Sequence, residues 1–375
     1  MDIVANKALL FKAQNPNIIL DTIPKSKAVS DDEVVVYWGI RESQVLNKLG
    51  YKKTPSPIKR DYKWQGKFKP FDHQIETSSF LTLHKRACCF NEQGTGKTAS
   101  VIWAADYLMT IGEVKRVLVI CPLSIMSSAW LTDLFSCAMH RTASICHGTH
   151  KKRQKILDEG AEFVVINYDG VEIVANEIAK GGFDLIVVDE ANAYKNTSTR
   201  RWKVLNKLAQ QTSYLWMLTG TPASQSPVDA FGLAKLINPE NTPRFAGRWR
   251  EMVMQRVSQF TFIPRPQAKT LVHRVLQPAI RYTKEECLDL PEITYTTREV
   301  PLTPQQNKYY KLMRQELIVN AAGEDITMVN AATAMNKLLQ LSGGAVYSDE
   351  GETISFDVKP RMAVLQEIID ESSHK

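Results

Sequence analysis

A loop at residues 91–98, NEQGTGKT, carries the residue types that bind phosphate groups. Gly94 and Gly96 let the backbone turn tightly, so that its N–H groups, including that of Thr95 between them, come close to phosphate oxygens. The loop follows an apolar run and precedes an expected helix, whose N-terminus favours anions. These features predict a phosphate-binding loop. Asn91 stands where such loops usually have their first glycine, so a chance match is the alternative.

The same loop ends in two residues with complementary chemistry. Lys97 can reach the β- and γ-phosphates of a nucleoside triphosphate, and the hydroxyl of Thr98 can bind Mg²⁺. We therefore predict a nucleoside triphosphate and Mg²⁺ as cofactors, with Lys97 as a catalytic residue. The stretch from Gly94 to Thr98 is the predicted binding loop.

Two adjacent carboxylates, Asp189 and Glu190, follow the apolar run at residues 185–188. Burying such a pair is costly unless a cation or a reaction needs it. We predict that Asp189 holds Mg²⁺ through its water shell and that Glu190 orients and deprotonates the attacking water. An acidic surface turn is the alternative, and the strand that leads straight into the pair disfavours it.

A third polar motif, LTGTP at residues 218–222, also ends an apolar run. The hydroxyls of Thr219 and Thr221 can hydrogen-bond the carboxylates and sense the γ-phosphate. Taken alone the motif is also an ordinary turn. Its significance comes from its order along the chain and its position after a strand.

The elements that position these motifs alternate between short β-branched runs and longer helical stretches. The expected strands are RACCF (86–90), RVLVIC (116–121), FVVIN (163–167), FDLIVVDE (183–190) and YLWMLTG (214–220). Strands that are apolar on both faces and alternate with helices predict an α/β fold with a parallel sheet and helices on both faces. Ligands of such sheets bind beyond the carboxyl ends of the strands, where the polar motifs lie.

The chain divides into three predicted domains. Residues 1–60 form a small α+β accessory module, residues 61–240 the ATP-binding lobe, and residues 241–375 a mainly helical segment. The stretch 48–69 is rich in Lys and Arg and contains Tyr51, Tyr62, Trp64 and Phe68. A solvated linker and a segment that contacts nucleic acid are equally good interpretations of it.

The bulk composition is typical of a soluble globular protein. Of 375 residues, 44% are hydrophobic and 23% charged, with a net charge of +7 that mildly favours a polyanionic partner. No apolar run is long enough for a membrane span, and the N-terminus lacks a secretory signal, so we predict a cytoplasmic protein with no membrane partner, or a nuclear one in a eukaryote. The six cysteines are predicted to be reduced core thiols. A zinc site of Cys137, Cys146, His147 and His150 is a weaker alternative.

Taken together, the motifs resemble those of the superfamily-two helicases, specifically the Swi/Snf-type DNA translocases. The resemblance rests on GTGKT, CPLSIMSSAW (121–130), VVDEANAYKN (187–196) and LTGTPASQSP, in the family's order. FKPFDHQ (68–74) is similar to the adenine-reading motif, with Gln74 as the base-recognising residue. The segment QPAIRYTKEECLDLPEITYTTREVPLTPQQNKYY resembles the bridge that follows the first motor lobe. The front module is not included in this resemblance, although its small size is similar to that of accessory modules in phage-type members of the family.

The resemblance implies two RecA-like lobes that close on ATP, with DNA lying across both. It implies that Lys97, Thr98, Asp189 and Glu190 bind and hydrolyse MgATP. It also implies a rim that faces double-stranded or branched DNA. The residues expected on that rim are Pro122, Ser124, Asn167, Tyr168, Lys195 and Asn196, for which ordinary loop and packing roles are nearly as good an interpretation.

Two features depart from the family. Asn192 stands where the family usually has His; its amide can still hydrogen-bond a neighbour, so we expect hydrolysis to survive and coupling to DNA to be affected. No motif of a second lobe follows the bridge, so we expect that lobe elsewhere in the full-length protein and slow turnover by this chain alone. An RNA helicase and a nucleotide-dependent nucleic-acid-binding platform are the alternative functions.

Overall fold

The computed structural model describes residues 1–223, 225–258, 261–287, 295–323, 328–347 and 352–371. The chain divides into two compact units, Met1–Leu290 and Pro291–Lys375. The first unit contains the front module and the α/β lobe, and the second is mainly helical. Within the described residues, no helix combines the length and apolarity that crossing a bilayer requires.

The front module is built on a four-stranded antiparallel sheet in the order β1-β2-β4-β3. Residues of β2 and β4 alternate between buried and partly exposed, which turns Leu9, Phe11, Val34 and Val36 toward one small core. The module contains both strands and helices. The module's elements are β1 (Asp2–Val4), β2 (Ala8–Lys12), α1 (Pro16–Thr22), β3 (Ser26–Ala28), β4 (Glu33–Tyr37) and α2 (Ile40–Lys48).

The α/β lobe is built on a seven-stranded sheet in the order β13-β5-β10-β9-β6-β8-β7, in which every pairing is parallel. All five predicted strands are confirmed. Two more were not predicted: β7, and β13, which comes from beyond residue 240 and forms one edge. The strands are β5 (Arg86–Cys89), β6 (Val117–Cys121), β7 (Ala143–Cys146), β8 (Phe163–Asn167), β9 (Leu185–Val188), β10 (Tyr214–Leu218) and β13 (Ala279–Ile280).

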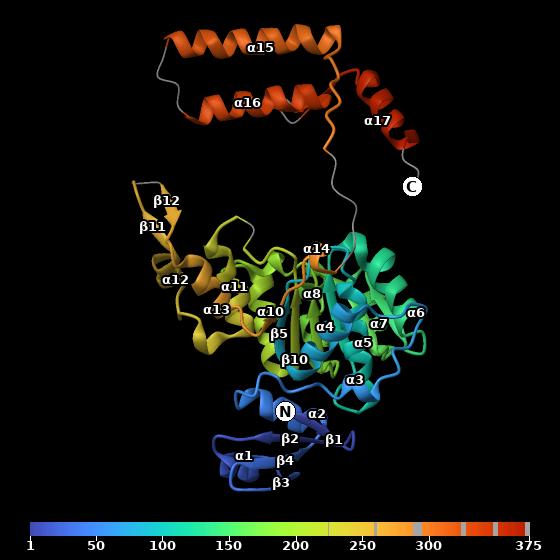
Figure 1. Cartoon of the computed structure of the whole chain (residues 1–375). Coiled ribbons are helices and arrows are strands. Elements are labelled where there is room, and N and C mark those ends of the chain that lie inside the picture. Colours follow the sequence, from blue (N-terminus) through green and yellow to red (C-terminus); the bar gives the residue numbers. More distant parts are fainter. Residues whose placement is uncertain (224, 259–260, 288–294, 324–327, 348–351, 372–375) are drawn as a thin grey trace. The chain divides into compact units, whose positions relative to one another are not determined.

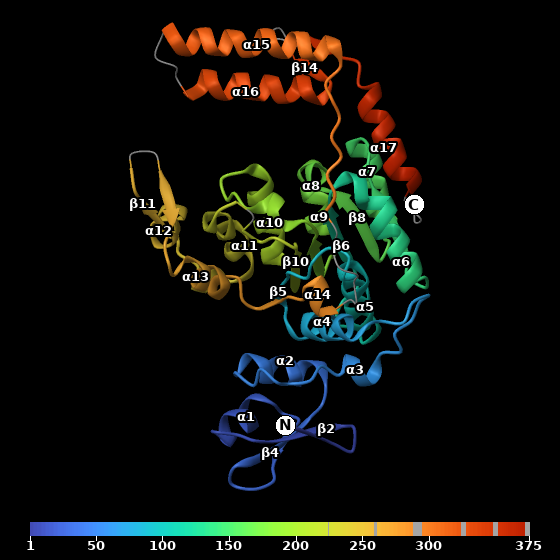
Figure 2. The ribbon, with the colours of Figure 1, turned by 45° about the horizontal axis from the view of Figure 1, so that its top comes forward.

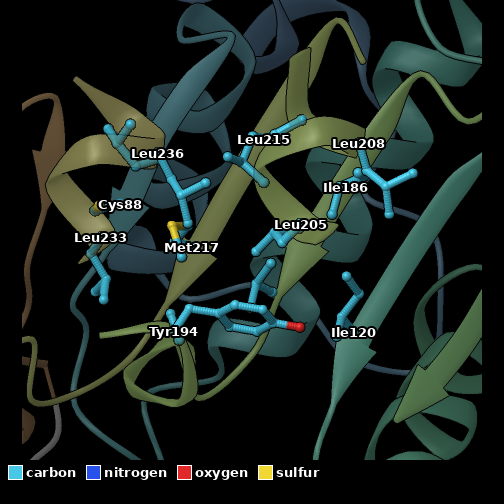
Figure 3. Close-up of a cluster of buried hydrophobic side chains, with 14 of the residues drawn as sticks. Cys88, Ile120, Ile186, Tyr194, Leu205, Leu208, Leu215, Met217, Leu233 and Leu236 are labelled. Atoms are coloured by element: carbon cyan, nitrogen blue, oxygen red, sulfur yellow. The ribbon is translucent and has the colours of Figure 1, made fainter. Parts of the chain in front are cut away.

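Both faces of this sheet are buried, as the unbroken apolar runs predicted. Successive residues of a strand enter opposite cores, so in β10 Leu215 and Met217 belong to one cluster and Trp216 to the other. Figure 3 shows the first cluster, where Leu215 and Met217 lie among Leu205 and Leu208 of a helix on that face.

Helices cover the two faces of the sheet in separate sets (Figures 1 and 2). The set that shares the Trp216 core is α3 (Ile58–Asp61), α4 (Asp72–Leu83), α5 (Lys97–Thr110), the π-helical turn η2 (Met126–Leu131) and α6 (Thr132–Cys137). The set that shares the Leu215 core is α7 (His150–Asp158), α8 (Tyr168–Ile173), α9 (Ala175–Lys180), α10 (Arg200–Gln211), α11 (Ala230–Ile237), α12 (Ala246–Val253) and α13 (Ala268–Val275).

Short elements complete the lobe. They are the 3₁₀ turns η1 (Leu123–Ile125), η3 (Ala191–Tyr194), η4 (Pro227–Asp229) and η5 (Pro239–Asn241), the hairpin β11 (Met254–Arg256) and β12 (Phe262–Pro264), and α14 (Lys284–Cys287).

The second unit contains the predicted helices and a hairpin that was not predicted. Its small core joins Leu341, Val346 and Phe356. The elements are α15 (Pro304–Gly323), α16 (Met328–Gly343), β14 (Ala345–Tyr347), β15 (Thr353–Ser355) and α17 (Lys359–Glu371).

Candidate nucleotide-binding site

Three loops leave the carboxyl ends of neighbouring strands and meet at one edge of the sheet. The order β5-β10-β9 places the strand before Thr219 between the strand before the glycine loop and the strand before the acid pair. Leu218 lies opposite Cys89, and the amide of Thr219 donates to the carbonyl oxygen of Cys89 at 3.1 Å. The sheet therefore brings the three predicted motifs together, in the place where parallel sheets bind ligands.

The glycine loop is folded by its own hydrogen bonds. Thr95 Oγ1 and Lys97 Nζ both donate to the carbonyl oxygen of Glu92, at 2.7 and 3.1 Å. Gly94 and Gly96 have φ values of +84° and +76°, in the left-handed region that favours glycine. Helix α5 begins at Lys97 without a side-chain cap, which leaves its first N–H groups available to an anion, and Thr98 lies in its first turn.

Gln74 is tied to the glycine loop. Its Oε1 accepts from the backbone N–H of Phe71 at 3.0 Å, and its Nε2 donates to the carbonyl oxygen of Thr95 at 3.2 Å. The neighbouring His73 contacts that same oxygen through Nε2 at 2.8 Å. The residue predicted to read adenine therefore also supports the loop, and His73, which the sequence did not single out, supports it too.

Asp189 is held in a buried position beside the loop. Its Oδ2 accepts from the indole N–H of Trp130 at 2.9 Å, and its Oδ1 accepts from the backbone N–H of Glu190 at 2.9 Å. Burial raises the pKa of Asp189, while these two hydrogen bonds and the positive charge of Lys97 lower it. The strand order and the contacts of Thr219 with Cys89 and Asn192 place the glycine loop beside the acid pair.

Glu190 adopts a backbone conformation that is rare for residues with a side chain. Its φ is +46° and its ψ is 55°, in the left-handed region. Tyr168 stabilises this turn, because its hydroxyl donates to the carbonyl oxygens of Asp189 at 2.7 Å and Glu190 at 3.3 Å. Strained backbone of this kind is retained where the surrounding structure fixes it, as the Tyr168 hydroxyl does here.

Asn192 joins the acid pair to the third motif. Its Nδ2 lies 3.1 Å from Thr219 Oγ1, 2.7 Å from the carbonyl oxygen of Thr221 and 3.2 Å from Thr221 Oγ1. The amide thus makes the neighbour contacts that the sequence led us to expect. All three predicted coupling residues lie in one hydrogen-bonded group.

Asn91, the departure from the usual glycine, has a structural role. Its Nδ2 donates to Thr77 Oγ1 at 2.8 Å, and its Oδ1 accepts from the backbone N–H of Tyr282 at 3.1 Å. The amide of Glu92 in turn donates to the carbonyl oxygen of Tyr282 at 2.9 Å. The segment after β13 therefore supports the start of the glycine loop. The two contacting residues, Asn91 and Tyr282, are 191 positions apart in the sequence, so no local pattern indicated this contact.

The six residues expected on a DNA-facing rim lie after β6, at the end of β8 and after η3, but several are engaged in local contacts. Asn167 Oδ1 accepts from Arg153 at 3.1 Å. Lys195 Nζ lies 3.3 Å from an Asp229 oxygen, and Asn196 Oδ1 accepts from the backbone of Ser198 at 3.0 Å. Tyr168 supports the acid pair. Pro122 is half-buried and Ser124 is exposed.

The alternative zinc site is wrong. Cys137 and Cys146 lie in the two different cores, on opposite faces of the sheet. His150 instead pairs with Glu177 at 3.1 Å. In the part of the chain that the structure describes, no cluster of His, Cys, Asp and Glu side chains could hold such an ion. All six cysteines are free thiols, and every one but Cys287 is buried.

The aromatic residues of the basic segment at 48–69 serve mainly in packing. Tyr62 is buried, and its hydroxyl donates to Asp106 at 2.6 Å. Trp64 packs edge-on against Trp103, and Tyr51 packs against Phe11. Phe68 is exposed. The segment is therefore a folded connection whose lysines, more than its rings, face solvent.

The parallel sheet, with a glycine loop and an acid pair at its carboxyl edge, defines a RecA-like α/β lobe of the phosphate-loop class. Within that class, the chain belongs to the SNF2-related domain family, whose model matches residues 73–343.

Relatives include viral, bacterial and eukaryotic proteins. A putative protein p41 of Acyrthosiphon pisum secondary endosymbiont phage 1 is 26% identical over 321 residues, which cover 81% of this chain and 69% of the relative. The uncharacterized ATP-dependent helicase YqhH of Bacillus subtilis is 24% identical over 46% of this chain. The chromatin remodeling factor mit1 of Schizosaccharomyces pombe is 23% identical over 79% of it. The chain spans 30% of YqhH and 22% of mit1.

A solved structure has the same fold. The Sulfolobus solfataricus SWI2/SNF2 ATPase core in complex with dsDNA matches with a TM-score of 0.52 and 23% identity, over 82% of this chain and 66% of that one.

Proposed function

We propose that this chain binds and hydrolyses MgATP and uses the energy to move on double-stranded DNA, as a translocase of the remodelling or branch-migration type. The observation that carries the proposal is the strand order β5-β10-β9, in which Thr219 bonds Cys89 at the start of the glycine loop and Asn192 beside the acid pair. Membership of the SNF2-related family supports the ATPase activity.

The residues present fit a magnesium-bound triphosphate. The left-handed conformations of Gly94 and Gly96 turn the loop tightly, and the uncapped start of α5 offers N–H groups to phosphate oxygens. Lys97 would hold the β- and γ-phosphates, and Thr98 and Asp189 would hold Mg²⁺, which neutralises charge on the phosphates when bound. Glu190 would orient the attacking water and accept its proton.

The DNA part of the proposal rests on family likeness. The Sulfolobus solfataricus core of the same fold is known in complex with double-stranded DNA, and mit1 is named as a chromatin remodeling factor. Residues Pro122, Ser124, Asn167, Tyr168, Lys195 and Asn196 remain the proposed DNA-facing rim. A second RecA-like lobe is the proposed partner for closing the nucleotide site.

The test compares ATP hydrolysis by the protein, as its gene encodes it, in the presence of duplex DNA, single-stranded DNA and RNA of equal length. Duplex DNA should stimulate hydrolysis most, and stimulation by RNA alone would contradict the proposal. Lys97→Ala should weaken binding of a fluorescent ATP analogue about 10- to 100-fold, because a charged hydrogen-bond donor to phosphate is lost. Normal nucleotide binding by this variant would refute the assigned site.

A further inference from the structure

A groove lies between the front module and the α/β lobe, outside the nucleotide site. Its volume is about 930 Å³. One wall is formed by residues 47–59, which run from the end of α2 into α3, and the other by α4, η5 and the edge strand β13. None of the predicted nucleotide-binding or rim residues lines it.

The groove is strongly basic. Four of its lining residues are lysines, Lys48, Lys52, Lys53 and Lys59, and Glu76 is its acidic residue. Lys59 pairs with Glu76. Lys48, Lys52 and Lys53 are exposed, and no carboxylate among the described residues pairs with them. Three lysines of the described chain therefore lie along one wall without an ion pair, and Lys52 and Lys53 also line a neighbouring hollow with Asp2 and Glu33.

The positive charge continues beyond this groove. A second hollow of about 780 Å³ shares Lys48, His84 and Pro278 with it and extends along the amino ends of β5 and β10. There it adds Lys85, whose ammonium lies 5.9 Å from the centre of the Tyr214 ring. The two hollows together form a basic channel, which we call the lysine channel, on the side of the module that faces the lobe.

The lining favours a phosphate backbone over stacked bases. Asn238, Asn241 and Gln277 offer neutral amides beside the lysines. Sites for single strands combine positive charge with exposed rings on which bases stack. The channel's aromatic rings of Phe80 and Tyr282 are half-buried and already contact neighbours: the ring centre of Phe80 lies 4.2 Å from that of His84, and the ring centre of Tyr282 lies 5.9 Å from that of His73. The chemistry therefore fits the outside of a duplex, which presents phosphates and hides its bases.

We propose that the lysine channel is an accessory binding site for the phosphate backbone of duplex DNA. The channel lies apart from the predicted rim, whose residues lie after β6, at the end of β8 and after η3. The front module would therefore provide a second DNA contact that does not depend on base sequence. The proposal needs no nucleotide turnover and is tested without ATP.

The first test measures binding of a fluorescent duplex by anisotropy over a range of salt concentrations. The triple variant Lys48→Glu, Lys52→Glu and Lys53→Glu should bind duplex DNA at least tenfold more weakly. The slope of log affinity against log salt concentration should also become smaller in magnitude by about two to three, because each lost phosphate contact removes roughly one released counterion. A control of equal charge change, Lys7→Glu, Lys27→Glu and Lys63→Glu, uses exposed lysines that line neither hollow. It should stay within about threefold of the unaltered protein.

Three results would overturn the proposal: unchanged duplex binding by the channel variant, equal loss in the control, or a greater loss for single-stranded than for duplex DNA. The unaltered protein, the channel variant and the control variant should all bind a fluorescent ATP analogue equally well. Equal binding would show that both variants are folded. If no protein binds the analogue, the ATPase proposal fails while the channel result still stands.

A second measurement locates the contact. In a Cys287→Ala background the remaining five thiols are buried, so a new surface thiol is the reactive one. Duplex DNA should slow maleimide labelling of Lys52→Cys several-fold and leave labelling of Lys27→Cys unchanged. Equal labelling rates at position 52 with and without saturating duplex would refute the site.

Discussion

The indole N–H of Trp130 donates a hydrogen bond of 2.9 Å to a carboxylate oxygen of Asp189, and both side chains are buried. Burial alone would favour the protonated carboxyl group, because it raises the pKa of Asp189. The Trp130 bond lowers that pKa, as do the Glu190 amide and the Lys97 charge. The π-helical turn that carries Trp130 thus opposes the effect of burial and favours the ionised form, which the proposed role of Asp189 as a magnesium ligand requires.

Trp130→Phe should weaken the use of Mg²⁺ by the site. The ring still fills the core, but the carboxylate loses a hydrogen-bond donor, a loss of about 1.5–3 kcal/mol for a charged acceptor. We expect the Mg²⁺ concentration for half-maximal ATP hydrolysis to rise about tenfold or more. Trp103→Phe is the matched control, because Trp103 lies in the same core and its N–H donates to the Gln65 carbonyl oxygen. An unchanged Mg²⁺ dependence in Trp130→Phe would contradict the assigned role.

Local patterns predicted the strands and the polar motifs that follow them, but not the contacts between those motifs. The glycines before Lys97 and the carboxylates after β9 are recognisable because both motifs are contiguous and follow apolar strands. The strand β13 is only two residues long and follows a proline, so no periodicity revealed it. The contact between Trp130 and Asp189 also depends on how η2 packs on the sheet, which sequence spacing does not encode.

Glu190→Gln should separate nucleotide binding from hydrolysis. The amide keeps the shape of the side chain but cannot accept the proton of the attacking water, so turnover should fall about 10²- to 10⁴-fold. Affinity for a fluorescent ATP analogue should stay within about threefold, since no charge that holds the phosphates is removed. Hydrolysis at the normal rate by Glu190→Gln would show that another residue is the base.

Gly96→Ala should disable the loop beyond the effect of backbone strain. A β-carbon at this position would lie 2.0 Å from Gln74 Nε2, an atom fixed by its bond to Thr95. Gly112→Ala is the control, because Gly112 has the same φ of +76° but open space around it. Both changes should cost about 1–2 kcal/mol of unfolding free energy from the left-handed conformation. Only Gly96→Ala should also lose ATP-analogue binding, and equal binding by the two variants would exclude a role for the Gln74 contact.

Asn192 offers a test of how the acid pair communicates with the third motif. Asn192→Leu keeps a similar volume but removes the donor that reaches Thr219 and Thr221, and it leaves the Thr221 carbonyl oxygen without this partner. Glu190 and Lys97 are untouched, so basal hydrolysis should fall less than about threefold, while stimulation by duplex DNA should be largely lost. Asn192→His restores a ring N–H donor and should recover most of the stimulation. If Asn192→Leu responds to duplex DNA like the unaltered protein, the hydrogen-bonded group of Asn192, Thr219 and Thr221 has no part in coupling, and its role is confined to holding two adjacent loops together.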